Sequence, residues 1–158
     1  FLGYRSSWWS WKFYQQQVAE VEKLLERFAK EADSNIDIEK YLQICDQLGQ
    51  DPDPAKMPLE LSDFPEEVQV AFFVFSLLTD RWEGMSGSYL GKHWEGIDYI
   101  FKIYGIPDPA TTYFYMKMWE NILVAHRLQE AERKRKAEER KAKSSAGGGK
   151  TYTHNVQG

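Results

Sequence analysis

The stretch FPEEVQVAFFVFSLL at residues 64–78 decides the fold class of this chain. Its apolar residues recur at steps of three and four instead of alternating, which is the period of a helix. They cover most of the helix circumference, so we expect this helix to lie at the centre of the domain. Asp63 stands three residues before Glu66, with Pro65 between them, and this spacing predicts a capped N-terminus for the helix.

Apolar residues at helical spacing predict four more helices around this stretch. We expect them at about residues 6–32, 38–48, 94–104 and from 109 onward. Gly49 follows the second helix at a position where helices commonly end, and Asp108 before Pro109 marks the start of the last one. There is almost no strand signal. The predicted fold is therefore all-α, a compact bundle of about five helices with a long charged C-terminal helix and an extended tail.

The last predicted helix changes character near Leu128. The residues expected to point inward before this position are Phe114, Met118, Ile122 and either Leu123 or Val124. After it, glutamates alternate with lysines and arginines, so the helix should continue into solvent as a charged rod. We divide the chain into a helical domain with an aromatic N-terminal segment at 1–128, a charged helical extension at 129–143, and a flexible or partner-bound tail at 144–158.

Length, cysteine content and hydropathy narrow the class of protein. A chain of 158 residues fits one domain with its own core. The single cysteine, Cys45, lies among apolar residues and is expected to be a small buried side chain in a reducing compartment, which favours a cytoplasmic location. The longest apolar run, at residues 68–78, is much shorter than a membrane helix requires, so we expect no membrane partner.

Charge is distributed unevenly along the chain. Residues 129–143 contain seven Lys/Arg against four Glu, a net charge of +3, and the total of −4 leaves −7 for the rest. The basic residues are Arg133, Lys134, Arg135, Lys136, Arg140, Lys141 and Lys143. A solvated helix accounts for them, because positive charge near a helix C-terminus is favourable by itself. The alternatives are contact with nucleic-acid phosphates or with a protein partner.

Aromatic residues crowd the N-terminal segment. They are Tyr4, Trp8, Trp9, Trp11, Phe13 and Tyr14, and a helix here would be aromatic on most of its circumference. The rings could cap the core of this domain, or they could dock into a partner or a second copy. Membrane-surface insertion is disfavoured, because only Arg5 and Lys12 are close enough to meet lipid headgroups. We take these six residues, with Tyr152 of the tail, as candidate partner-binding residues.

No catalytic or metal site is evident in the sequence. Nucleophilic catalysis needs an activated side chain with a base in reach, and zinc needs closely spaced ligand pairs. The three histidines, His93, His126 and His154, are far apart from one another and from the only cysteine. The sequence therefore predicts a protein that is not an enzyme and holds no cofactor.

A glycine-rich segment contains the run GSYLGKH at residues 87–93. It partly resembles a phosphate-binding loop, but the glycine spacing is one residue short and a histidine stands where the magnesium-binding hydroxyl should be. We expect a tight connection in which Gly84, Gly87 and Gly91 adopt left-handed backbone angles. The alternative is a contact loop in which Lys92 meets an anion.

The run from Pro58 to Ile106, PLELSDFPEEVQVAFFVFSLLTDRWEGMSGSYLGKHWEGIDYIFKIYGI, resembles small accessory proteins encoded by contractile-tailed phages. This resemblance covers residues 58–106. It implies an all-helical component or assembly factor of a virion or tail, or a chaperone for one, located in the host cytoplasm or the virion. It implies no catalytic residue.

The sequence as a whole predicts a non-enzymatic structural or assembly protein of a multi-subunit complex. Its partners would be its own copies or other subunits, and buried aromatic anchors would hold the contact. The alternative is a nucleic-acid-binding accessory factor that uses the basic C-terminal helix and whose affinity falls steeply with salt.

Overall fold

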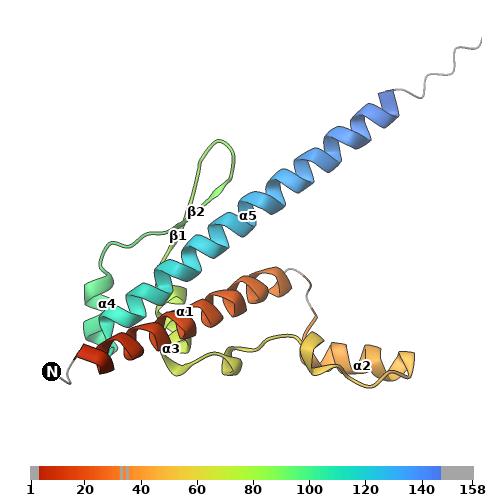
Figure 1. Cartoon of the computed structure of the whole chain (residues 1–158). Coiled ribbons are helices and arrows are strands. Elements are labelled where there is room, and N and C mark those ends of the chain that lie inside the picture. Colours follow the sequence, from red (N-terminus) through yellow and green to blue (C-terminus); the bar gives the residue numbers. More distant parts are fainter. Residues whose placement is uncertain (1–3, 33, 35, 147–158) are drawn as a thin grey trace, which may run out of the picture.

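The computed structural model describes residues 4–32, 34 and 36–146, which are mostly helical (Figure 1). In chain order the elements are α1 (Tyr4–Ala32), α2 (Ile38–Leu48), the short 3-10 turns η1 (Pro54–Lys56) and η2 (Leu61–Asp63), α3 (Glu66–Leu77), β1 (Asp80–Trp82), β2 (Tyr89–Lys92), α4 (Ile97–Ile103) and α5 (Pro109–Ala146). The predicted all-α class, with about five helices and a long charged C-terminal helix, is confirmed. The predicted tail lies outside the described residues from position 147 onward.

Local signals fix the ends of α2 and α5 where the sequence predicts them. Gly49 closes α2 with a φ of 62°, and its N–H bonds back to carbonyls of the last turn. Asp108 precedes α5, and its carboxylate accepts a hydrogen bond from the N–H of Thr111 at 3.1 Å. Pro109 is the first residue of α5, where its missing N–H costs nothing.

The start of α3 differs from the prediction. The helix begins at Glu66, and Asp63 does not cap it, because its carboxylate accepts the N–H of Glu60 at 2.8 Å in the preceding turn. Phe64 has an extended backbone and a side chain that is only 3% exposed. A residue before proline is disfavoured in the helical region, so Pro65 separates the acidic turn from the helix.

The glycine-rich segment forms an antiparallel hairpin, and its two short strands were not predicted. Asp80 of β1 lies opposite Lys92 of β2, and Trp82 lies opposite Tyr89 across an irregularity in the register. Strands of three and four residues are too short for alternating polarity to show in the sequence. Two of the three glycines predicted to be left-handed have positive φ, Gly87 at 66° and Gly91 at 98°, whereas Gly84 does not.

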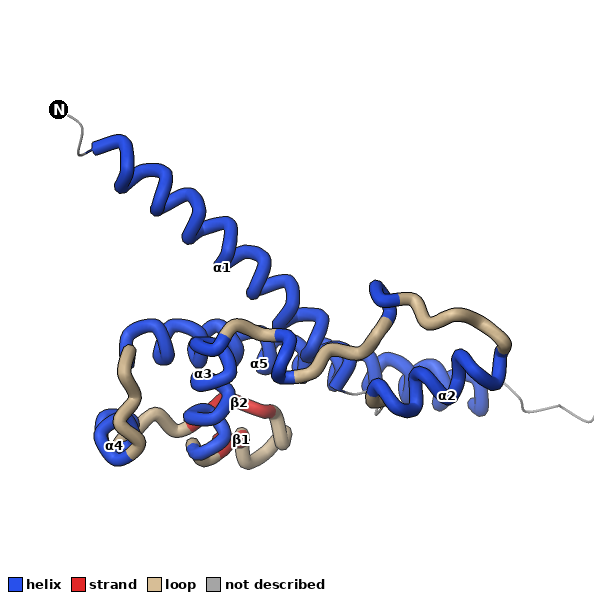
Figure 2. The backbone as a smooth tube through the Cα atoms, turned by 90° about the horizontal axis from the view of Figure 1, so that it is seen from below, coloured by secondary structure: helices blue, strands red, loops and turns tan. Residues whose placement is uncertain are grey.

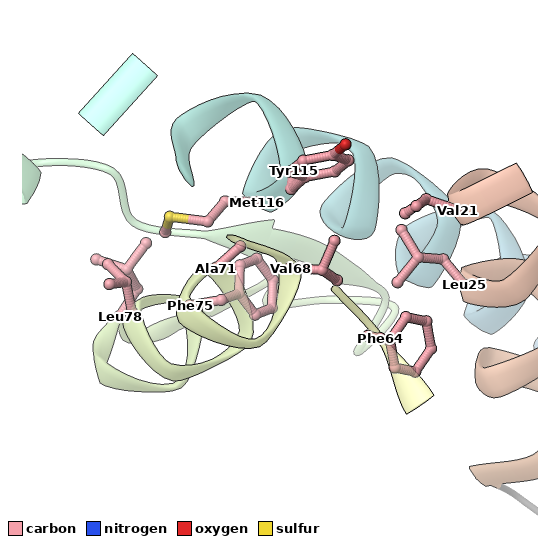
Figure 3. Close-up of a cluster of buried hydrophobic side chains, with 10 residues drawn as sticks. Val21, Leu25, Phe64, Val68, Ala71, Phe75, Leu78, Tyr115 and Met116 are labelled. Carbon is pink, nitrogen blue, oxygen red and sulfur yellow. The ribbon is translucent and has the colours of Figure 1, made fainter. Parts of the chain in front are cut away.

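The core lies where α1, α3 and α5 meet, with α3 at its centre as predicted (Figure 3). The buried cluster consists of Val21, Leu25, Phe64, Val68, Ala71, Val74, Phe75, Leu78, Tyr115 and Met116. The circumference of α3 is not fully buried, however, because Phe73 and Leu77 are 46% and 39% exposed.

Part of the aromatic content extends this core. Phe28 of α1 meets Phe64 edge to face with ring centroids 5.4 Å apart, and Phe72 of α3 meets Trp119 of α5 at 5.0 Å. Edge-to-face contacts of this kind add to the stabilisation that burial provides. Together they link α1, the segment before α3, α3 itself and α5.

The inward face of α5 is rotated from the predicted stripe. Met118, Ile122 and Leu123 pack against the core as expected. Phe114, however, is 40% exposed, and the next residues, Tyr115 and Met116, are buried instead. The reason is a polar residue inside the stripe: Glu120 is buried one turn after Met116 and takes an inward position that hydropathy does not predict.

Two helical arms leave this body. The N-terminal part of α1 projects away from the other elements in Figure 2. At the other end of the molecule, α5 runs past the hairpin to Ala146 (Figure 1). Its 38 residues make it about 57 Å long at 1.5 Å per residue. The predicted charged extension is therefore helical and continues three residues further than expected.

Candidate interaction surfaces

The first candidate surface is the arm formed by the N-terminal part of α1. The backbone is helical from Tyr4, as the aromatic spacing requires. Of the six candidate aromatics in this arm, Tyr14 has a described side chain, which is 43% exposed. The side chains of Tyr4, Trp8, Trp9, Trp11 and Phe13 lie outside the described residues, as does all of Tyr152.

The second candidate surface is the basic extension of α5, in which all seven predicted basic residues are exposed. Three pairs lie within ion-pair distance along the helix: Arg133 with Glu130 at 2.8 Å, Lys136 with Glu132 at 2.7 Å, and Arg135 with Glu139 at 3.8 Å. Lys134, Arg140, Lys141 and Lys143 form no ion pair within the described part of the chain. Four cations of the extension therefore lack an ion-pair partner, and because Glu138 also lacks one among the described residues, the unpaired residues carry a net charge of +3.

Lys92, the predicted anion contact, is not available at the surface. It is 8% exposed, its Nζ lies 2.9 Å from Asp80 Oδ1, and the same ammonium donates to the carbonyl of Leu78 at 2.9 Å. The ring of Phe75 lies beneath it, with the centroid 4.9 Å away. An anion would have to displace these partners, so the geometry argues against this contact.

A buried carboxylate that the sequence does not indicate lies next to Lys92. Glu120 of α5 is 6% exposed. Its Oε1 accepts the backbone N–H of Lys92 at 2.6 Å and the indole N–H of Trp94 at 2.8 Å. Its Oε2 accepts from the ammonium of Lys117. The bonds from Lys92 and Trp94 hold the hairpin and the segment after it against α5, and Lys117 of the same helix neutralises the carboxylate, so this carboxylate is structural in its geometry.

The folded structure holds Asp80 and Glu120, the two acids of this region, in their charged forms. Burial by itself would raise the pKa of Asp80, but the hydrogen bond and charge of Lys92 outweigh it and lower that pKa. Burial would likewise raise the pKa of Glu120, but hydrogen bonds from Lys117, the Lys92 N–H and Trp94 lower it. Burial raises the pKa of the Tyr89 hydroxyl, which donates to Asp80 at 3.2 Å.

One signal in the sequence could have revealed this cluster. Glu120 stands among Met116, Trp119 and Leu123, which occupy the apolar stripe of the helix. An acid at such a position must be paired or hydrogen-bonded, because a buried unpaired charge is very costly. The hairpin that supplies its partners could not be recognised from so short a run.

The hairpin presents an aromatic and cationic surface beside α5. The guanidinium carbon of Arg127 lies 4.1 Å from the ring centroid of Tyr89 and 5.4 Å from that of Trp82. Trp82 remains 53% exposed, and Met85 at the tip of the hairpin is 98% exposed. This surface lies where the basic extension of α5 begins.

A further apolar surface lies on α3 and the end of α4. Phe73 of α3 and Tyr104 after α4 meet edge to face at 5.2 Å, although both are about half exposed. Tyr99 and Ile103 stand one turn apart on α4 and are more exposed still, at 67% and 59%.

Metal-ligand clusters and membrane-spanning helices are both absent from the described residues. These residues contain no group of three or more His, Cys, Asp or Glu side chains arranged to hold a metal ion. None of the helices in the same part of the chain is long and apolar enough to cross a membrane.

No family model, curated protein or solved structure matches this chain. The function must therefore be inferred from the surfaces themselves.

Proposed function

We propose that this protein is a non-enzymatic structural or assembly subunit of a multi-subunit complex, and that it joins its partners through its two helical arms. The observation that carries the proposal is that both long helices continue beyond the core (Figures 1 and 2). A 29-residue α1 and a 38-residue α5 are longer than packing on a 12-residue α3 requires. Helix that extends past its core is available for contact with another molecule.

The composition of the arms supports this role. Residues 4–14 of α1 include six aromatics, and tryptophan and tyrosine are the side chains that most often dominate the energy of protein interfaces. They bury a large area at a small cost in conformational entropy. An aromatic helix exposed to water would promote association, so a partner surface is the environment that suits it.

The resemblance at residues 58–106 suggests the setting. In the structure this run contains α3, the hairpin and α4, which pack with α1 and α5 in the body from which the arms extend. We propose a phage virion or tail, or its assembly in the host cytoplasm, as the context of the complex. The partners would then be copies of this chain or other subunits of the same particle.

Molar mass by light scattering tests the proposal on three proteins: the full chain, a variant lacking residues 1–14, and a variant ending at Leu128. Circular dichroism first establishes that each variant is folded. We expect the full chain to self-associate and the loss of one arm to give a folded monomer. Association that survives the loss of either arm would contradict the proposal. If all three are monomers, self-assembly through the arms is wrong, and another subunit becomes the partner to seek.

One observation favours nucleic-acid binding as a second candidate function. Trp82 is half exposed beside Arg127, so a stacking ring and a cation lie next to each other where the basic extension begins. Affinity for single-stranded DNA should then fall with salt by roughly 0.7 log units per log unit of salt for each neutralised phosphate. Replacing Lys134 and Lys141 by Gln should reduce this dependence on salt. Trp82→Ala should weaken binding but leave the dependence on salt unchanged. Binding that is insensitive to both changes would exclude this function.

A further inference from the structure

A cleft of about 490 Å³ lies between α1, the start of α3 and the start of α5. Its floor is apolar, since Val21 and Tyr115 are buried and Leu24 is half-buried. Its rim is acidic, with four exposed carboxylates: Glu20, Asp63, Glu67 and Asp108. Among the residues whose side chains the structure describes, no lysine or arginine lines it. An adjoining cleft of about 240 Å³ shares two of these acids and adds Glu66.

The charge of the rim is only partly satisfied within the described residues. Asp63 and Asp108 accept backbone N–H groups at 2.8 and 3.1 Å. Glu20 and Glu67 form neither a hydrogen bond nor an ion pair with the described residues. Asp63 and Glu67 stand at the end of an acidic stretch, residues 31–67, which contains eleven Asp/Glu against two Lys. Several like charges around an apolar floor favour a basic occupant whose charged groups are carried on apolar stems.

The same chain contains a basic helical segment. The extension of α5 carries cations without an ion-pair partner at Lys134, Arg140, Lys141 and Lys143, and its net charge is +3. Lys134 and Lys141 are seven residues apart, so they lie on the same face of the helix. Long basic side chains can lay their methylene stems on an apolar floor while the charged ends meet carboxylates at the rim.

The extension cannot reach the cleft of its own chain. The cleft includes Thr111 and Tyr115 near the N-terminus of α5, and the cations lie toward the other end of the same helix. The distance along α5 from Tyr115 to Lys134 is about 28 Å at 1.5 Å per residue, and it is greater for the other three. A rigid helix holds these two surfaces apart, so an extension that fills this cleft must come from another molecule.

We propose that the basic end of α5 of one copy docks in the acidic cleft of a second copy. This inference rests on the proposed function and names its partner as a second copy of this chain. Each copy offers one cleft and one extension, so the contact is heterologous and joins copies head to tail. Such contacts form a ring if the rotation between copies closes, and an open chain if it does not.

Charge reversal on both sides tests the contact in the full chain. The cleft variant carries Glu20→Lys and Glu67→Lys, and the extension variant carries Lys134→Glu and Lys141→Glu. Like charges would then face each other, which should weaken association of either variant by at least about tenfold. An equimolar mixture of the two should associate again, because each wild-type surface finds its complement in the other variant. Sedimentation velocity at low and high salt measures all of these.

The matched control is Glu22→Lys with Glu95→Lys, which changes the net charge equally at exposed acids outside the cleft. This control should associate like the wild type, and added salt should dissociate both. A wild type that stays monomeric at low salt, or a mixture that fails to associate, would overturn the inference. A third result separates the two proposals. If both charge-reversal variants still associate and only the variant lacking residues 1–14 does not, the head-to-tail contact is wrong and the proposed function stands.

Discussion

Glu120 connects three parts of the molecule through one carboxylate. It accepts from the Lys92 N–H on β2, from the Trp94 indole after the hairpin, and from Lys117 on its own helix. Removing one member of a buried hydrogen-bonded pair leaves the other member buried without a partner. The resulting loss of stability is larger than the net contribution of the intact pair. The packing of the hairpin on α5 should therefore depend on this single residue.

We expect Glu120→Ala to lower the free energy of unfolding by about 2–4 kcal/mol, because three donors lose their acceptor. Urea unfolding followed by circular dichroism measures the change. The control is Glu132→Ala, which removes an exposed carboxylate 2.7 Å from Lys136 and should leave stability unchanged within error. Equal effects of the two substitutions would show that the buried carboxylate is not a structural link.

Gly91 is the glycine whose replacement should be most harmful. A Cβ at this position would lie 2.3 Å from Glu120 Oε1, and its φ of 98° is one that side chains rarely adopt. Gly87 has a positive φ but open space around it, and Gly84 has neither constraint. We therefore expect Gly91→Ala to cause the largest loss of stability. Gly87→Ala should cost about 1–2 kcal/mol, and Gly84→Ala should be nearly neutral. Thermal unfolding of the three variants tests this order, and a harmless Gly91→Ala would disprove the close approach of the hairpin to α5.

At the scale of elements, the hairpin depends on two carboxylates whose charge varies with pH: Asp80 pairs with Lys92 across its strands, and Glu120 holds it to α5. The folded state lowers the pKa of both Asp80 and Glu120, so these carboxylates are held charged more strongly than in the unfolded chain. Their contribution to stability is complete above their ordinary pKa values of about 4. It is lost as the pH falls through those values and then through the lower values of the folded state.

The urea midpoint should therefore fall between about pH 5 and pH 3 in the wild type. A variant with Asp80→Asn and Glu120→Gln should be less stable at pH 7 and should lose less on acidification. Other carboxylates with a lowered pKa, such as Asp37 and Asp108, remain in both proteins and set a common background. Parallel pH profiles of the two proteins would contradict the assignment of the charged hairpin contacts.

Helices and short strands were predictable to different degrees for physical reasons. The ends of α2 and α5 follow from Gly49 and Asp108, because caps act within a few residues of sequence. The hairpin was not predicted, since β1 and β2 together hold seven residues and are stabilised by contacts to α5 from 28 positions away. The inward face of α5 was misassigned at Phe114 for the same reason: a buried acid pairs with residues that are distant in the sequence.

The candidate surfaces were likewise predictable where they depend on local sequence and unpredictable where they depend on distant residues. The basic extension was predictable because an exposed helix needs only local charge pairs to be recognised. The burial of Lys92 was not, because it depends on Asp80 and Phe75 being brought around it by the hairpin and α3. The acidic cleft combines side chains from α1, α3 and α5, and no single stretch of the sequence contains it.

At the scale of the whole molecule, length and charge act together. The acidic cleft lies at the start of α5, and the cations without an ion-pair partner lie toward the other end of the same helix. A helix of about 57 Å holds the cleft and these cations apart, which prevents their contact within one chain and favours it between chains. The elongated shape is thus the property on which both proposals depend.

This shape predicts a specific result in small-angle X-ray scattering. A compact domain of 158 residues would have a radius of gyration of about 15 Å. The full chain, measured in high salt to suppress association, should exceed this value clearly and show a maximum dimension of at least about 57 Å, the length of α5 alone. Ending the chain at Leu128 shortens α5 to about 30 Å, so both quantities should drop by more than the loss of mass requires. A full-chain radius near 15 Å would mean that the arms fold back onto the body, and head-to-tail docking would then lose its geometric basis.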